Sequence, residues 1–393
     1  MYKILLLISS ALVINLTKAE EIDFSSSIGL EFRGFIQKPI STTQASGVTP
    51  SVFFEPEIKW RSNDRAQRFS FVGFTRYDNQ DSDRTHTDFR ELYWSYNHHN
   101  WTTTVGINKV FWGVTESNHL VDVINQTDLI EDIDQEDKLG QPMIYVSNQQ
   151  DWGKLDFFIL PYFRERTFPG EKGRFNFGLA VDDNSVYQSS AKKRHIDYAF
   201  RYSHYFGDID VGLHIFDGTN REPRLLPSAD FSKLIATYEQ MSQIGIDMQY
   251  TREAWLWKLE SIYRKTKIDN FMAVVAGFEY TFFQINDAAD LGLLMEYQYD
   301  NRNELSAPTS ADNDLFLATR LALNDSQDTS ILTGVVIDTE NDSTFVNIEA
   351  ERRLAKNLSA KLRIRILTNV EPTDPTIAFA KDDYIQLSLN WFF

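Results

Sequence analysis

Basic side chains occupy every second position near the C-terminus, at Lys361, Arg363 and Arg365. Alternate residues of an extended strand point to the same face, so these three cations would form one basic column. Because rings of Arg and Lys favour anions in pores, the column is a candidate anion path. The alternative is a wall of mixed, paired charges. Three further charged residues are expected on the same inner face: Arg201, Arg264 and Glu296.

The segment 110–141 combines many apolar residues with a dense acidic run. Five of the seven residues from Glu131 to Asp137 are Asp or Glu. Exposing so many apolar residues to water is unfavourable, and one hypothesis is that the segment folds into the lumen of a channel and narrows it. The alternative is a surface loop packed on neighbouring loops. In the first case four polar residues would meet a solute: Asn118, Asp122, Asn125 and Asp128.

Two other polar segments carry arginines next to glutamates. Guanidinium groups bind carboxylate and phosphate groups through paired hydrogen bonds, so these arginines could form an external access site for an anionic or amphipathic solute. The alternative is that they form ion pairs that hold the two segments together. The residues concerned are Arg164, Arg166, Arg221 and Arg224.

Catalytic and metal-binding patterns are absent from the sequence. A serine-hydrolase site needs a histidine held against a nucleophile, and no nucleophile motif accompanies any of the seven histidines. His119, near Glu116 and Asp122, is the one histidine in the long segment 110–141. There is no D-x-D-x-D-G calcium loop and no cysteine. We therefore predict that the protein is not an enzyme and has neither a metal site nor a cofactor.

The elements that position these residues alternate apolar and polar side chains. In residues 384–393 the apolar set is Ile385, Leu387, Leu389, Trp391 and Phe393. A soluble sandwich would leave the charged faces of other such segments in bulk water. A membrane β-barrel turns the apolar faces to lipid and the polar faces to a wet lumen. The terminal Phe393 also resembles the signal read by the barrel-assembly machinery, which we expect as a partner.

Eighteen segments alternate in this way or are aromatic-rich and bounded by turn residues. They are approximately 26–37, 50–60, 68–77, 88–96, 101–109, 142–150, 154–163, 194–206, 208–217, 241–251, 254–265, 271–284, 290–300, 313–323, 329–338, 344–353, 358–368 and 382–393. The predicted fold is all-β: a transmembrane antiparallel up-and-down β-barrel of about 18 strands, or 16 as the alternative count, with short periplasmic turns and long extracellular loops. Barrels of this size leave room for an aqueous channel, which indicates transport.

The N-terminus predicts export. Lys3, the apolar stretch 4–16 and the small residues around Ala19 are typical of a signal peptide of residues 1–19, which leaves residues 20–393 as the barrel. Loss of Lys3 and Lys18 changes the formal charge from −17 to −19, because two cations are removed. A charge this negative argues against nucleic acid as a partner.

Several short motifs lie between residues 88 and 225. They are Glu91-Leu92-Tyr93, Gly106-Ile107-Asn108-Lys109, Trp112-Gly113, Val121-Asp122-Val123-Ile124-Asn125, Asp128-Leu129 and the runs 163–170 and 218–224. This series resembles a large family of Gram-negative outer-membrane proteins described as a domain of unknown function and related in architecture to porins and alginate-export barrels. Lys109 stands where the family pattern has Arg, and Gln126 where it has Pro. The resemblance implies a barrel of similar size with a transport role.

These patterns together predict a porin-like channel in the outer membrane of a Gram-negative bacterium. It would pass small solutes passively or with weak selectivity, and would contact outer-membrane lipid and lipopolysaccharide. The alternative is a gated transporter of hydrophobic or amphipathic solutes, which would need an apolar path through the lumen. Some inward positions are apolar: Phe158, Leu256 and Phe316.

Overall fold

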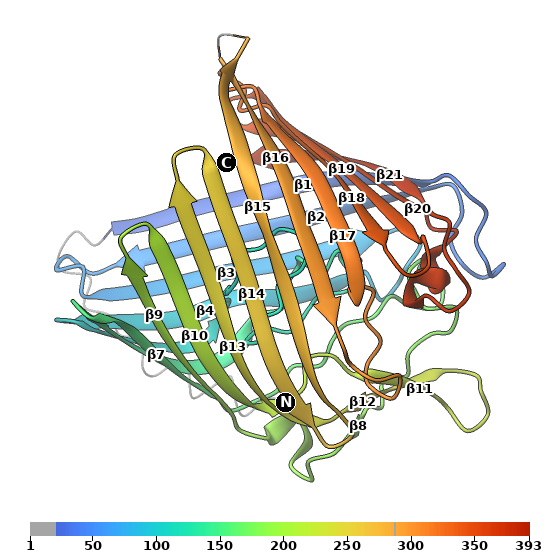
Figure 1. The fold of residues 1–393 in the computed structure, drawn as a ribbon, viewed down its shortest axis with the longest axis horizontal. Helices are drawn as coiled ribbons and strands as arrows, with labels where there is room; N and C mark the ends of the chain where they lie inside the picture. Colours follow the sequence, from blue (N-terminus) through green and yellow to red (C-terminus); the bar gives the residue numbers. More distant parts are fainter. Residues whose placement is uncertain (1–20, 287) are drawn as a thin grey trace.

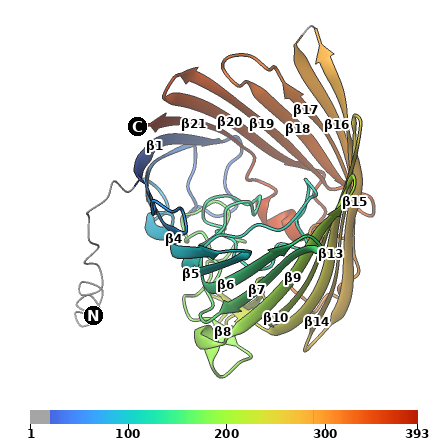
Figure 2. The ribbon, with the colours of Figure 1, turned by 90° about the vertical axis from the view of Figure 1, so that its left-hand side faces the viewer.

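A single closed sheet dominates the computed structural model, which describes residues 21–286 and 288–393. The predicted signal peptide, residues 1–19, lies outside the described residues. Each barrel strand pairs antiparallel with the next barrel strand along the chain, and β1 (Glu21–Phe35) pairs with β21 (Tyr384–Phe392) to close the barrel (Figures 1 and 2). Within the described residues, no helix is long and apolar enough to cross a membrane.

Eighteen strands form the barrel, as the alternation predicts. Besides β1 and β21 they are β2 (Val48–Arg61), β3 (Gln67–Asp78), β4 (His86–His98), β5 (Trp101–Asn108), β6 (Gln141–Gln150), β7 (Gly153–Leu160), β9 (Asp197–Phe206), β10 (Ile209–Thr219), β13 (Gln240–Arg252), β14 (Trp255–Thr266), β15 (Asn270–Ile285), β16 (Ala289–Asp300), β17 (Asn313–Ala322), β18 (Ser330–Asp338), β19 (Thr344–Ala355) and β20 (Leu358–Thr368). Every predicted segment overlaps one of these strands. The count of 18 is therefore confirmed, and the alternative of 16 is wrong.

Side chains alternate between the two faces of the wall as expected. In β21, Ile385 and Leu387 are exposed on the outer face, whereas Gln386, Ser388 and Asn390 are buried on the inner face. Exposed Leu, Ile, Trp and Tyr side chains cover the outer face of most other strands too. An apolar surface that encircles a protein is suited to contact with hydrocarbon rather than water.

Connections at one end of the barrel, which we name the turn end, are short. They include 99–100, 151–152, 207–208 and 253–254. His99 and Gly207 have positive φ angles of 53° and 64°, as the tight turns that match the twist of antiparallel strands require. Ser26 and Phe393 exchange two backbone hydrogen bonds near this end, so both ends of the barrel sequence lie together.

Connections at the opposite end, the loop end, are mostly long. A small separate sheet forms there from β8 (Val186–Tyr187), β11 (Arg224–Pro227) and β12 (Leu234–Tyr238), and the β11–β12 hairpin projects from the barrel (Figure 1). The sequence does not predict this sheet, because strands of two to five residues are too short to show a period of two. The longest uninterrupted connection, 109–140, is named the inner loop.

Candidate functional site

The inner loop lies inside the barrel (Figure 2). Its residues Val121 and Ile124 are completely buried and belong to one apolar cluster with inward side chains of the wall, among them Phe158, Phe216 and Ile262. Burying such side chains contributes roughly 1.5–3 kcal/mol each. This packing holds the loop against the side of the wall that runs from β6 to β15.

Glu260 on β14 fastens the first half of the inner loop. Its carboxylate accepts hydrogen bonds from the backbone N–H groups of Val114 (2.7 Å), Thr115 (3.0 Å) and Val121 (3.1 Å), and from the Thr115 hydroxyl (2.7 Å). The side chain of Glu260 is fully buried. A buried charge is stable only when it is paired in this way. The loop therefore stabilises the buried carboxylate, and the carboxylate holds the loop against the wall.

Glu296 on β16 makes a second anchor of the same kind. It accepts hydrogen bonds from the backbone N–H groups of Glu116 and Ser117, both at 2.8 Å, and from the Ser117 hydroxyl. Arg320 on β17 binds the Glu116 carboxylate at 2.7 Å. Glu296, predicted to line the pore, is 1% exposed. Its contacts show that it holds the loop and does not face open solvent.

The acidic run of the inner loop reaches the opposite side of the wall. Asp132 pairs with Arg363 on β20 and accepts a hydrogen bond from the Tyr384 hydroxyl at 2.8 Å. Asp134 pairs with Arg365 at 3.0 Å. Burial raises the pKa of Asp132, but Arg363, Arg33 and Arg365 outweigh this effect and hold the pKa below its usual range. The loop thus crosses the lumen and is tied at both sides.

Most of the four polar residues expected to meet a solute have buried side chains that bind other groups of the protein. Asn125 is 1% exposed and binds the loop's own backbone, accepting from Val110 N–H (2.9 Å) and donating to the Leu139 carbonyl (2.8 Å). The carboxylate of Asp122 pairs with Lys138. Asp128 is fully buried. The expectation is wrong for these three, because short side chains in a folded loop satisfy its backbone and charges first. Asn118 and Asp122 are both partly exposed as residues, but the side chain of Asp122 is completely buried.

The basic column on β20 exists, but its members are paired. Arg363 and Arg365 hold the inner loop, and Arg365 also binds Glu349 at 2.6 Å. Lys361 pairs with Glu351 at 3.2 Å and is the most exposed of the column. The mixed-charge wall is therefore the interpretation that the contacts favour over a continuous anion path.

Arg201 and Arg264 are also paired on the inner face. Arg201 binds Asp247 at 2.7 Å and lies over the ring of Trp112, 5.1 Å from its centroid. Arg264 binds Glu222 at 2.7 Å. Both residues therefore connect the wall to structures packed against it and do not offer free charge to a solute.

The loop-end arginines mainly form ion pairs that connect one segment to another. Arg164 binds Asp88 at 2.8 Å, Arg224 binds Glu239 at 2.9 Å, and Arg221 binds Asp197 at 2.6 Å. Arg221 also donates to the Ile124 carbonyl of the inner loop at 3.1 Å. Their contacts match the ion-pair alternative of the sequence analysis. Arg166 differs, because its guanidinium group donates a hydrogen bond to the neutral Gln126 amide oxygen at 3.4 Å.

Exposed charged side chains indicate an opening between the inner loop and part of the wall. On the loop side it is bordered by the exposed residues 135–137. The Glu136 side chain is 57% exposed there and forms an ion pair with His119. On the wall side the Arg320 and Lys361 side chains are 41% and 51% exposed although they point inward, and Arg320 also contacts the first half of the loop through Glu116. Such exposure inside a closed barrel requires water there.

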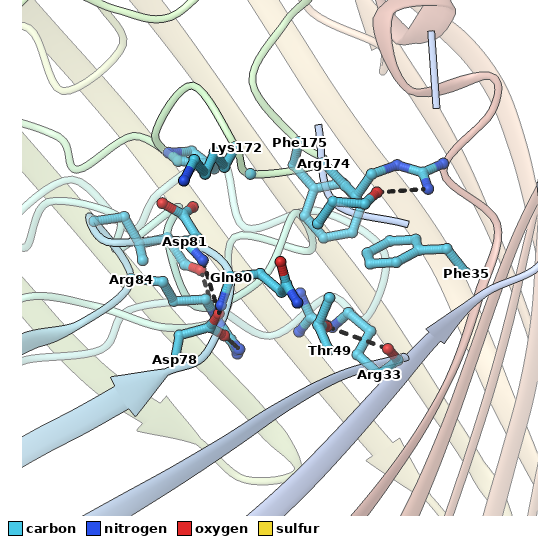
Figure 3. A pocket seen from close by; sticks show the side chains of 14 residues that line it. Arg33, Phe35, Thr49, Asp78, Gln80, Asp81, Arg84, Lys172, Arg174 and Phe175 are labelled. Atoms are coloured by element: carbon cyan, nitrogen blue, oxygen red, sulfur yellow. Dashed lines mark hydrogen bonds and ion pairs between the residues drawn. The ribbon is translucent and has the colours of Figure 1, made fainter. Parts of the chain in front are cut away.

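A cavity at the loop end is too small for a solute. It measures about 30 Å³ and lies among Arg33, Asp78, Asp81, Arg84 and Arg174 (Figure 3). This is space for water molecules only, since one water needs roughly 10–15 Å³ measured in this way. Burial raises the pKa of the Asp81 carboxyl group there. The cavity is therefore part of the packing between loops and wall.

Comparison with known proteins supports the fold alone. No protein-family model and no curated protein matches this sequence. The trimer form of OmpT, an outer-membrane protein of Vibrio cholerae, superposes with a TM-score of 0.50 at 11% identity and covers 96% of this chain and 100% of its own. A mutant of the Rh. blastica porin gives 0.46 at 12% identity, with 95% and 100% covered. The superposition on OmpT therefore shows that the chain has a porin-like closed β-barrel fold.

Proposed function

We propose that the protein is an outer-membrane channel and that small polar solutes pass through the opening beside the inner loop. The supporting observation is that the loop is fastened across the lumen while charged side chains opposite it stay exposed to water. Barrels of 16–18 strands are wide enough for an aqueous path. The inner loop then sets the width of that path.

Charge on the two sides of the opening is arranged for weak selectivity. The loop edge is acidic through Asp134, Glu136 and Asp137, whereas the wall opposite carries Arg320 and Lys361. Glutamates 349 and 351 lie beside these cations on the wall. Because both signs are present, small anions and cations both pass, and the balance of charge sets the ratio of their permeabilities.

The same proposal includes the location of the protein. The apolar outer face contacts outer-membrane lipid, the long loops face outward beside lipopolysaccharide, and the turn end faces the periplasm. Export uses the signal peptide of residues 1–19. Phe393, whose backbone joins the last strand to Ser26, presents the C-terminal strand to the barrel-assembly machinery.

A hydrophobic-solute transporter and an enzyme are less well supported. Phe158 is covered by Trp112 and Tyr145, and Phe316 is buried against Leu294 and Leu332, so these side chains form packing and not an apolar path. We propose no catalytic activity, because His119 pairs with Glu136 and His214 bonds Gln243, with no nucleophile beside either ring in the part of the chain described.

Planar-bilayer recording of the refolded mature chain tests the function. We expect discrete conductance steps and a small reversal potential in asymmetric KCl, as for a weakly selective pore. A control recording uses the same detergent and refolding buffer without protein. A properly folded barrel that gives no steps would contradict the proposal and would favour the gated transporter instead.

Acidification is expected to shift the channel toward anions. Burial and the negative charge of Asp132 raise the pKa of Asp134 to about 6. Asp137 touches water, but the protein around it inside the barrel reduces its solvation, and this effect together with Glu131 and Asp134 raises its pKa to about 7. A carboxyl group is neutral below its pKa, so between pH 8 and pH 5 the opening loses two negative charges. Burial lowers the pKa of His119, but Glu136 and Glu260 outweigh it and raise the pKa to about 10, so that ring stays protonated throughout.

Reversal potentials at pH 8 and pH 5 measure this shift. The matched control is the double variant Asp134→Asn, Asp137→Asn, which should behave at both pH values as the unmodified chain does at pH 5. An equal shift in the double variant would assign the pH dependence to other groups.

A further inference from the structure

His86, the first residue of β4, has a hydrogen-bond partner at one ring nitrogen and none at the other. Its Nδ1 lies 3.0 Å from the carbonyl oxygen of Arg84. Because a carbonyl oxygen only accepts hydrogen bonds, Nδ1 carries the proton. The neutral ring then has its lone pair on Nε2. That atom is buried and has no hydrogen-bond partner.

The free nitrogen points at two carboxylates of the inner loop. His86 Nε2 lies 3.6 Å from Glu131 Oε1 and 4.0 Å from Asp128 Oδ2. A lone pair that faces two negative charges is repelled unless a cation lies between them. Arg76 and Arg90 bind the two carboxylates, both at 2.6 Å, but neither forms a bond to Nε2.

We propose that His86, Asp128 and Glu131 bind a divalent transition-metal ion of the Zn²⁺ class. One imidazole nitrogen and two carboxylate oxygens are a donor set that such ions accept. The donor atoms lie within 4.8 Å of one another. Bond lengths of roughly 2.0–2.1 Å in a tetrahedral site place donors about 3.3 Å apart, so shifts of less than about 1 Å complete the site.

Neighbouring groups orient the three ligands. The Arg84 carbonyl fixes the imidazole, as second-shell partners of metal-bound histidines do. The Thr167 hydroxyl donates to Asp128 Oδ1 at 2.5 Å, which leaves Oδ2 on the side of His86. Each carboxylate oxygen has two lone pairs, so the oxygens that bind arginine still have one available for a metal.

A metal here would join the barrel wall to the inner loop, because His86 belongs to β4 and both carboxylates belong to the loop. The ion would hold the acidic half of the loop beside the wall at the loop end. This inference does not depend on the proposed channel function, since binding is measurable on the barrel in detergent without any conductance.

Zinc titration of the refolded mature barrel tests the site. We expect one equivalent of ZnCl₂ to bind by calorimetry and to raise the unfolding temperature. His86→Gln should weaken that binding at least about tenfold, because a ligand is lost. The matched control is the double variant His98→Gln, His99→Gln at the turn end, which should bind like the unmodified chain. Equal zinc binding by His86→Gln would overturn the site.

A measurement on the unmodified chain covers the case in which His86→Gln fails to fold. Substoichiometric Cu²⁺ should give an electron paramagnetic resonance spectrum with coupling to a single imidazole nitrogen, and excess Zn²⁺ should displace it. Absence of bound metal in both experiments would show that a proton on Nε2 fills the space between the ring and the carboxylates, and would overturn the proposal.

Discussion

Glu260→Gln is expected to increase single-channel conductance and its noise, and to lower the stability of the barrel. The carboxylate accepts four hydrogen bonds from the inner loop. A glutamine has one oxygen, which can replace Oε1, but its amide group would then turn N–H donors toward the N–H of Val121, and the negative charge is lost. Leaving a buried donor unsatisfied costs about 1–3 kcal/mol, which weakens the attachment of residues 113–121 to the wall.

Bilayer recordings and urea unfolding measure both effects. Glu279→Gln is the matched control: Glu279 is also an inward carboxylate, on the neighbouring strand β15, but its ion contacts are to Lys258 and Arg320 at 4.0 and 3.7 Å and not to the loop backbone. The control should keep the conductance and noise of the unmodified channel. Identical traces from Glu260→Gln and the control would show that this anchor does not set the width of the path.

Asp132→Asn is expected to make the channel more selective for anions and less stable. Asp132 is 1% exposed and neutralises Arg363, whose inward side chain is 27% exposed. Its removal leaves that guanidinium group without its strongest partner and adds one net positive charge beside the path. Breaking a buried ion pair by removing one partner costs about 3–5 kcal/mol.

The change in selectivity appears in the reversal potential in asymmetric KCl, and the change in stability appears in urea unfolding. Glu351→Gln provides the comparison, because Glu351 and its partner Lys361 are both about half exposed. An exposed pair contributes roughly 0–1 kcal/mol, so that variant should unfold like the unmodified chain. Unchanged reversal potential in Asp132→Asn would mean that Arg363 does not contribute to the path.

The barrel could be predicted because its signal is local. In β20 and β21 each residue's side of the wall follows from a period of two, and short turns such as 99–100 fix where strands end. Counting the segments that alternate, or are aromatic-rich and bounded by turn residues, then gives the strand number. The family resemblance over residues 88–225 implies the size of the barrel, but it does not predict which side chains contact one another.

The site could be predicted only in part, because alternation says which way a side chain points and not what covers it. The sequence predicts Glu296 as an inward carboxylate, but the role of Glu296, like that of Glu260, depends on a loop more than 100 residues away that folds across the lumen. Asp122 and Asn125 are polar residues of a loop, yet they bind that loop's own backbone and Lys138. No period in the sequence encodes such contacts.

Modification of a cysteine at position 137 tests passage beside the inner loop most directly. The chain has no cysteine, so Asp137→Cys introduces a single thiol at the exposed loop edge. A bulky methanethiosulfonate reagent should then reduce conductance by about half or more, because the added group occupies the path. Ser232→Cys, on the projecting β11–β12 hairpin, is the control and should be unaffected. Full conductance of Asp137→Cys after complete labelling, verified by mass spectrometry, would contradict a path at this opening.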